Sequence, residues 1–98
     1  MQQIDFTVCE RILSSRWMLS ILWNLQQPQR FGTIQARLSG LSRGVLAAQL
    51  QELLNMGLVT QTKYLGFPPR VEYCLSEKGL QLTDILGQLP EALAPDPA

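Results

Sequence analysis

Basic side chains gather in the middle of this 98-residue chain, where they could bind a polyanion. The segment 30–70 has a net charge of +4, residues 71–98 have a net charge of −4, and residues 1–29 are neutral. An electrostatic field is local, so a basic middle attracts a nucleic acid even though the whole chain has no net charge. The charged residues of the basic middle are Arg30, Arg37, Arg43, Lys63 and Arg70, against one acid, Glu52.

Residues that carry catalysis or bind metals are scarce. The chain has no histidine, which removes the usual general base, the Ser-His-Asp triad and most zinc sites. Cys9 and Cys74 lack the CxxC spacing of a metal or redox pair, and there is no glycine-rich phosphate loop. We therefore expect a binding protein and not an enzyme, with no metal and no cofactor.

Length and composition indicate one domain with its own core. A 98-residue chain that is 46% apolar can fold without metals or disulfides. Two isolated cysteines are typical of a reducing compartment. No basic-then-apolar leader is present, and the apolar stretch 17–25 is much shorter than the roughly 20 residues that span a bilayer. These features predict a soluble, cytoplasmic protein with no membrane segment.

Apolar spacing predicts the elements that hold the basic residues in place. Phe6, Cys9 and Leu13 form the stripe of a first helix. Residues 17–25 are apolar on nearly all sides, which predicts a buried central helix with Trp17 and Trp23 in the core. Pro28 ends that helix, because proline cannot continue the hydrogen-bond ladder.

A helix-turn-helix follows. Phe31, Ile34 and Leu38 form the stripe of a short helix that stops at Ser39-Gly40. Ser42 is placed to cap a longer helix, and Gly57 to end it. A helix, a short turn and a second helix with facing apolar sides make a helix-turn-helix unit. The longer helix should bury Leu46, Leu50, Leu53 and Leu54.

Two alternating segments, 58–64 and 71–75, predict a β-hairpin whose proline-rich turn at 65–70 forms a wing. Ser76 should cap a last helix that is kinked or ends near Leu89, because Pro90 interrupts it. The predicted fold is mainly α with a small hairpin, a winged helix-turn-helix over residues 4–93. Residues 94–98 should be a disordered tail.

Several motifs resemble one known family. They are Ser15-Arg16-Trp17, Phe31-Gly32, Leu41-Ser42, Gly57-Leu58-Val59 and, most specifically, Pro68-Pro69-Arg70-Val71-Glu72-Tyr73-x-Leu75-Ser76-x-x-Gly79. Together they resemble the HxlR-type winged helix regulators, bacterial relatives of the MarR group, over about residues 4–89. The resemblance implies a dimeric transcriptional regulator. Its first and last helices would pair across the two-fold axis, its second helix-turn-helix helix would enter the major groove, and its wing would touch the DNA backbone.

Base contacts would come from the outward face of the longer helix. Arg43 could hydrogen-bond guanine bidentately, and alanines could touch thymine methyl groups. The family often has a basic residue and a hydroxyl where Gly44 and Ala47 stand, and arginine where Gln61 stands, so this chain has fewer contacts. Candidates for bases are Arg43, Gly44, Ala47, Ala48 and Gln51; candidates for phosphates are Thr33, Gln35, Arg37, Ser42, Lys63 and Arg70.

Two apolar stripes exceed what one small core needs. We expect them to form an isologous dimer interface, although both could pack on the monomer's own core. The redox-sensing cysteine of many family members would fall at Ile4, so Cys9 is expected in the core or the interface, with redox sensing as a second interpretation. The stripes consist of Phe6, Cys9 and Leu13, and of Leu82, Leu86 and Leu89.

Two functions fit these patterns. The first is a dimeric regulator that binds double-stranded DNA at a promoter operator, with its effector unknown. The alternative is a winged helix for protein–protein contact, favoured by the neutral net charge and by an apolar wing tip around Phe67. Whether the basic middle forms one continuous face distinguishes them.

Overall fold

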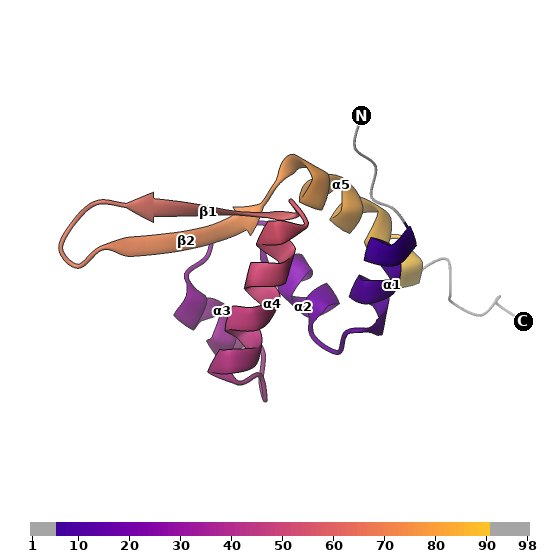
Figure 1. Ribbon diagram of the computed structural model, residues 1–98, viewed down its shortest axis with the longest axis horizontal. Helices are drawn as coiled ribbons and strands as arrows, with labels where there is room; N and C mark the ends of the chain where they lie inside the picture. The colour runs from indigo at the N-terminus through magenta and orange to yellow at the C-terminus, as the bar shows by residue number, and fades with distance from the viewer. Residues whose placement is uncertain (1–5, 91–98) are drawn as a thin grey trace, which may run out of the picture.

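The computed structural model describes residues 6–90. Residues 4, 5 and 91–93 of the predicted domain, and the predicted tail at 94–98, lie outside the described residues. The elements are α1 (Phe6–Ser14), α2 (Met18–Asn24), α3 (Phe31–Arg37), α4 (Arg43–Asn55), β1 (Val59–Tyr64), β2 (Arg70–Leu75) and α5 (Glu77–Leu86) (Figure 1). This order confirms the predicted winged helix-turn-helix, mainly α with one hairpin.

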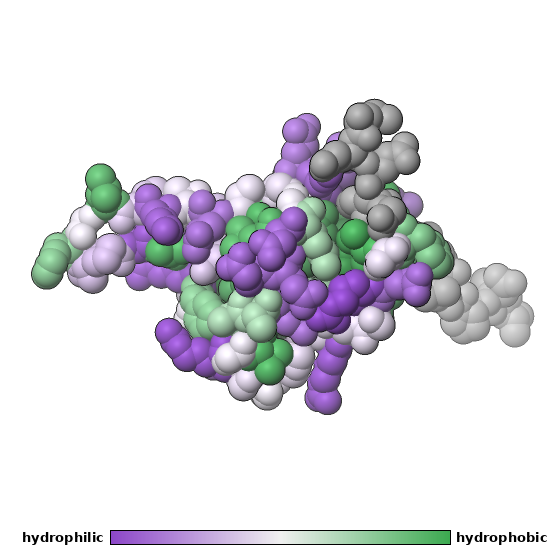
Figure 2. Space-filling model, in the orientation of Figure 1, coloured by the Kyte–Doolittle hydropathy of each residue, from purple (hydrophilic) through white to green (hydrophobic). Residues whose placement is uncertain are grey.

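The two strands form an antiparallel hairpin that projects away from the helices (Figure 1). Val59 pairs with Leu75 at its base, and Tyr64 pairs with Arg70 next to the turn. Along the shaft of the hairpin, every residue of β1 beyond Val59 is exposed, whereas residues 71–74 of β2 are half-buried and Tyr73 packs against the core. Hydrophilic side chains cover much of this shaft, and apolar side chains stand at its free end (Figure 2).

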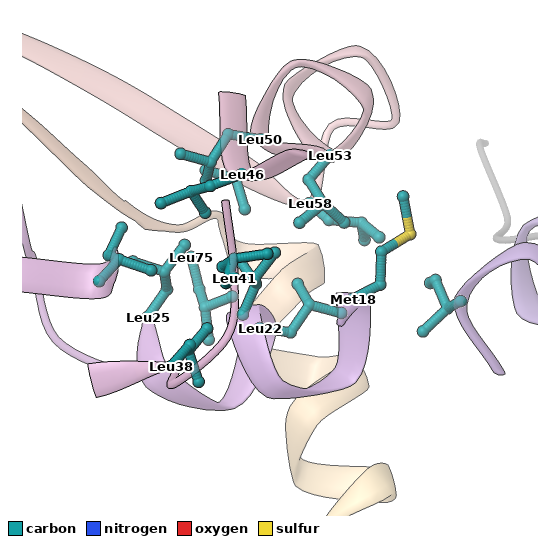
Figure 3. Close-up of a cluster of buried hydrophobic side chains, with 14 residues drawn as sticks. Met18, Leu22, Leu25, Leu38, Leu41, Leu46, Leu50, Leu53, Leu58 and Leu75 are labelled. Atoms are coloured by element: carbon teal, nitrogen blue, oxygen red, sulfur yellow. The ribbon is translucent and has the colours of Figure 1, made fainter. Parts of the chain in front are cut away.

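The core forms around one face of α2. Met18, Ile21, Leu22 and Leu25 follow the i, i+3, i+4, i+7 spacing of a helical stripe, and all four are fully buried. Burying one such side chain stabilises the fold by about 1.5–3 kcal/mol. Aliphatic side chains of the other elements converge on this stripe (Figure 3): Ile34, Leu38, Leu41, Leu46, Leu50, Leu53, Leu58 and Leu75.

One predicted core residue lies outside this cluster. Trp17 packs partly against the core, but the side chain of Trp23 is 53% exposed, so its prediction as a core residue was wrong. Trp23 is off the buried stripe of α2. Its indole instead lies over Gly87 at the end of α5, where an added Cβ would come within 3.2 Å of the ring. A helix that is apolar on most sides in sequence is thus buried on one face.

The predicted helix caps are present. Ser42 Oγ accepts a hydrogen bond from the backbone N–H of Val45 at 3.2 Å, which satisfies one of the free donors at the start of α4. Gly57 follows α4 with φ at +76°, a left-handed conformation that favours glycine. Ser76 Oγ accepts from the backbone N–H of Gly79 at 3.1 Å and donates to the carbonyl of Gly57. Ser76 therefore joins the end of α4 to the start of α5.

The last helix breaks before Pro90. α5 ends at Leu86, residues 87–88 form a turn, and residues 89–90 are helical again. Within α5, Gly79 and Thr83 face the core. The predicted stripe of Leu82, Leu86 and Leu89 is only partly buried.

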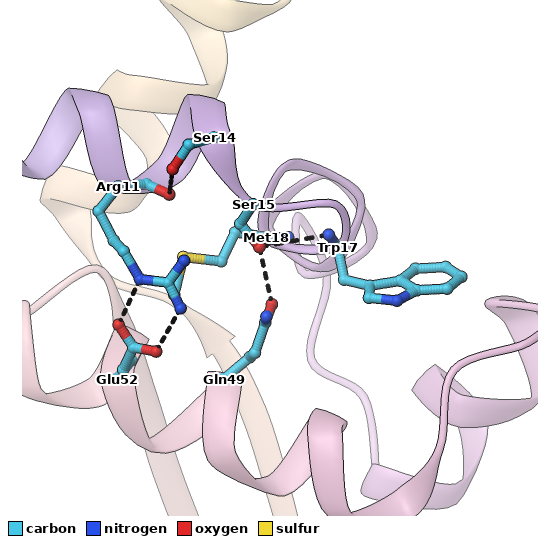
Figure 4. A network of polar contacts seen from close by, with 7 residues as sticks. All are labelled: Arg11, Ser14, Ser15, Trp17, Met18, Gln49 and Glu52. Carbon is cyan, nitrogen blue, oxygen red and sulfur yellow. Dashed lines mark hydrogen bonds and ion pairs between the residues drawn. The ribbon is translucent and has the colours of Figure 1, made fainter.

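An ion pair joins α1 to α4 (Figure 4). Arg11 donates from Nε and Nη2 to the two carboxylate oxygens of Glu52, at 2.8 Å and 2.6 Å. Glu52, the one acid of the basic middle, is half-buried by this contact. The hydrogen bonds between the two side chains lower the pKa of Glu52 and raise the pKa of Arg11.

Gly79 has no room for a side chain. An added Cβ would lie 2.1 Å from the carbonyl oxygen of Leu58, which the backbone of Ser76 also binds. We predict that Gly79→Ala lowers the free energy of unfolding by about 1–3 kcal/mol, because α5 must move away from the base of the hairpin. Urea denaturation measures this loss. Gly44→Ala is the matched control: nothing lies within 4 Å of its added Cβ, so it should stabilise α4 by roughly 0.5–1 kcal/mol.

The pKa shift of Glu52 predicts a pH dependence of stability. A carboxyl whose pKa is lowered by folding stabilises the fold above its ordinary pKa, and this contribution is lost as the pH falls through the lowered value. Glu52→Gln should therefore cost less than about 1 kcal/mol at neutral pH, since the pair is partly exposed. The difference from wild type should shrink on acidification. Urea melts from neutral to acidic pH test this, with the exposed Glu10→Gln as a control at neutral pH; a gap that widens in acid would contradict it.

Candidate nucleic-acid interface

α4 has one buried face and one open face. Leu46, Leu50 and Leu53 are buried against α2 and the base of the hairpin. Side chains three or four residues apart share a helix face, so residues 44, 47, 48 and 51 lie away from these leucines. The exposed residues include all five predicted base contacts, Arg43, Gly44, Ala47, Ala48 and Gln51.

Two glutamines of α4 point in different directions. Gln51 lies on the open face and donates a hydrogen bond to Asn55 one turn later, at 3.1 Å. Gln49 accepts a hydrogen bond from Ser15 Oγ at 3.3 Å and so faces the α1–α2 junction (Figure 4). Of the two, Gln51 is the side chain that a ligand on the open face of α4 could reach.

The start of α4 adjoins the start of α3. The guanidinium carbon of Arg43 lies 4.8 Å from the centre of the Phe31 ring, a cation–π contact. Phe31 is the first residue of α3, and Arg30 before it is the N-cap residue. Arg43 is thereby held at the corner where the two helices of the helix-turn-helix meet.

The basic residues continue from α3 onto the hairpin. Arg30, Thr33 and Arg37 line a surface groove together with Glu72 of β2. Glu72 is in turn paired with Arg70, with 3.5 Å between Nε and the carboxylate. The acid in this groove is therefore balanced by a neighbouring arginine.

The hairpin carries the last two basic residues. The Arg70 guanidinium carbon lies 4.4 Å from the centre of the Tyr64 ring, across the pairing of β1 with β2. Lys63 precedes Tyr64, opposite Val71, and is exposed. Contacts thus lead from the start of α4 through α3 to β2, and we call this surface the basic face: Arg43, Arg30, Thr33, Arg37 and Arg70. Because Lys63 is next to Tyr64, the partner of Arg70, its side chain points to the opposite face of the hairpin. The acid of α4, Glu52, lies elsewhere and is paired with Arg11.

Two of the predicted phosphate contacts have structural roles as well. Gln35 is half-buried and donates to the carbonyl of Leu41 at 3.5 Å, across the turn of the helix-turn-helix. The hydroxyl of Ser42 caps α4, although its residue is exposed. Thr33, Arg37, Lys63 and Arg70 are exposed. These four leave more of their side chains available to a ligand.

The predicted dimer stripes behave differently from each other. Phe6 is 77% exposed and Leu13 57% exposed on α1, so they do not pack on the monomer's own core. The remaining members of the stripes, Cys9, Leu82, Leu86 and Leu89, are half-buried. Leu80 and Ile85 of α5 are also exposed apolar residues, and neither belongs to the predicted stripe of Leu82, Leu86 and Leu89.

The structure does not point to other chemistry. Within residues 6–90, no cluster of three or more Cys, Asp or Glu side chains could hold a metal ion. Over the same residues, no helix is long and apolar enough to cross a membrane. Cys9 and Cys74 are both free thiols and half-buried.

Comparisons with known proteins match this architecture. The chain is 42% identical over 79 residues to the HTH-type transcriptional regulator YvaP of Bacillus subtilis, which covers 80% of this chain and 73% of YvaP. A MarR-family transcriptional regulator from Enterococcus faecalis V583 superposes with a TM-score of 0.78 at 34% identity, covering 93% of this chain and 86% of that one. The reduced form of the transcriptional regulator YodB from Bacillus subtilis superposes with a TM-score of 0.81 at 27% identity, covering 93% and 90%.

The family model described as HxlR-like helix-turn-helix matches residues 12–94. This range contains α2 to α5 and the hairpin, and so every element of the basic face. Motifs, fold and relatives agree, and the chain belongs to the HxlR-like helix-turn-helix family of transcriptional regulators.

Proposed function

We propose that the protein is a homodimer that binds double-stranded DNA at a promoter operator and so regulates transcription in the cytoplasm. The observation that carries this proposal is the open face of α4 beside the basic residues of α3 and β2. A helix with one exposed face fits the major groove, and the basic residues beside it fit the phosphates that border the groove.

In this proposal the N-terminal half of α4 contacts the bases. Arg43 donates two hydrogen bonds to guanine, and Ala47 and Ala48 touch thymine methyl groups. Gln51, which already bonds Asn55, reaches the next base pairs. One good bidentate pair contributes about 1–3 kcal/mol of discrimination, so this short set of residues gives moderate selectivity.

Phosphate contacts come from α3 and the hairpin. Thr33 and Arg37 of α3 and the exposed Lys63 and Arg70 of the hairpin would bind the backbone on either side of the major groove. A dimer would make roughly six to ten such contacts. Its affinity would then fall by about 10³–10⁵-fold between roughly 50 and 200 mM salt, because each contact releases counterions.

A dimer explains the apolar surface on α1. Phe6 and Leu13 face solvent on the monomer, and a two-fold interface built with the half-buried leucines of α5 would cover them. Two copies of α4 could then occupy successive major-groove sites about one helical turn apart. The proposed interface residues remain Phe6, Cys9, Leu13, Leu82, Leu86 and Leu89.

The basic face also favours DNA over a protein partner. A winged helix used for protein contact has no need of basic residues that run from α4 through α3 to the hairpin. The test is fluorescence anisotropy of labelled duplexes from the gene's own upstream region, with a random duplex as control, at several salt concentrations. Tight binding to one fragment that weakens steeply with salt is expected. A folded protein that binds no fragment even at low salt would contradict the proposal.

Two arginine variants separate base contacts from phosphate contacts. Arg43→Ala should weaken operator binding by about 1–3 kcal/mol and leave random-duplex binding nearly unchanged, because a base contact is lost. Arg70→Ala should weaken binding to both duplexes and lower the salt slope by about one unit per site. Salt titrations of both variants measure this. Equal losses on both duplexes for Arg43→Ala would remove its role in base recognition.

A charge on α1 should break the proposed dimer. Leu13→Asp would place a carboxylate in the two-fold interface. Because burial there would remove the hydration of the carboxylate, the variant should be monomeric. Analytical ultracentrifugation gives the mass. Leu65→Asp is the control, since it adds the same charge to a fully exposed leucine at the hairpin turn, away from α1, and should leave the mass unchanged. A Leu13→Asp protein that keeps the dimer mass would exclude α1 from the interface.

A further inference from the structure

The free end of the hairpin carries two apolar side chains that contact almost nothing. Leu65 and Phe67 are 102% and 103% exposed, as open as in an extended peptide. They stand at the end of a shaft whose other residues are mostly polar (Figure 2). The two side chains form a small apolar point at the end of a projecting hairpin, where a partner can reach it. Fully solvated, they bury no apolar surface in the monomer, and a partner that covered them would gain that burial.

The tip is held stiffly. Pro68 and Pro69 follow Phe67, and each proline ring restricts its own φ to about −65°. Directly behind them, Arg70 packs over the Tyr64 ring at 4.4 Å and closes the turn. A loop restrained in this way loses little conformational entropy when a partner binds it.

Positive charge lies on both strands just behind the tip. Lys63 is near the end of β1, and Arg70 begins β2. The acid of the hairpin, Glu72, is farther from the tip and paired with Arg70. An apolar point with a cation on each side is complementary to the minor groove, whose floor is bases and sugars and whose two rims are phosphates.

We propose that the hairpin tip inserts Leu65 and Phe67 as an apolar wedge at a base step of the minor groove, next to the major groove that α4 occupies. Lys63 and Arg70 bind phosphates on the two rims. The wedge rests on the proposed DNA binding and adds a second means of recognition to it. Side chains of this type unstack a base step and bend the duplex.

The wedge selects sequence without hydrogen bonds to bases. Pyrimidine–purine steps unstack most easily, so a TA or CA step should be preferred where the tip enters. This preference would compensate for the few base-reading side chains of α4. The operator should thus show a selected step in the flank of each half-site, at a position that no polar side chain of α4 contacts.

The experiment uses the full chain and the upstream fragment that it binds. The fluorescent adenine analogue 2-aminopurine, whose emission rises when it unstacks, replaces single adenines along the flank. Wild-type protein should raise the emission at one step. Phe67→Ala and the double variant Leu65→Ala/Phe67→Ala should abolish this rise and weaken binding about tenfold, as expected for one ring in contact with bases. Circular dichroism should show unchanged folds, since both side chains are solvated.

Lys63→Ala is the matched control on the same hairpin. It should weaken binding and reduce the salt slope, yet at saturation keep the emission rise. If wild type binds the operator, no flank position responds and Phe67→Ala binds equally well, the wedge is excluded while the proposed function stands. If Phe67→Ala changes the mass of the free protein, the tip is a contact between copies and the wedge is again excluded. Failure of the wild type to bind any duplex overturns both proposals.

Discussion

Exclusion of water from one face of α2 is the constraint on which the rest of the structure depends. Met18, Ile21, Leu22 and Leu25 form a short buried stripe, and leucines of α3, α4 and the hairpin base close over it. Within residues 6–90, these elements share this one hydrophobic core. Because the rear face of α4 is held here, its front face is held out in solvent. The same burial that stabilises the domain therefore presents the surface that we assign to DNA.

The polar contacts around this core fix the angles between helices, and this matters more than what they add to the stability of the fold. Ser76 joins the end of α4 to the start of α5, and the absence of a side chain at Gly79 lets α5 lie directly on the backbone of Leu58. On the other side, the Arg11–Glu52 pair connects α1 to the middle of α4. α1 also carries the apolar surface of the proposed dimer. In the proposed dimer, α1 would thus link the spacing of the two subunits to the orientation of each α4.

Signals local in the chain predicted most of the fold. Ser42, Gly57 and Ser76 predicted helix ends, because capping involves only neighbouring residues. The motif around Arg70 predicted the family. Predictions that depended on tertiary contacts were weaker: Trp23 lies outside the core because it is one position off the buried stripe, and Glu52 is paired with a residue 41 positions away. The directions of the exposed side chains of α4 followed from helical spacing. The molecules that these side chains contact could not be predicted in this way, since contacts with another molecule leave no pattern of burial within one chain.

The open face of α4 has a consequence for how such proteins diversify. Gly44, Ala47 and Ala48 are small and exposed, and an added Cβ at Gly44 would meet nothing within 4 Å. The residues that hold the helix in place, Leu46 and Leu50, lie on its other side. In the proposed complex with DNA, mutations on the open face would therefore change which promoter is bound without a loss of folding. Gene duplication followed by a few substitutions at these positions would be enough to create a regulator with a new target.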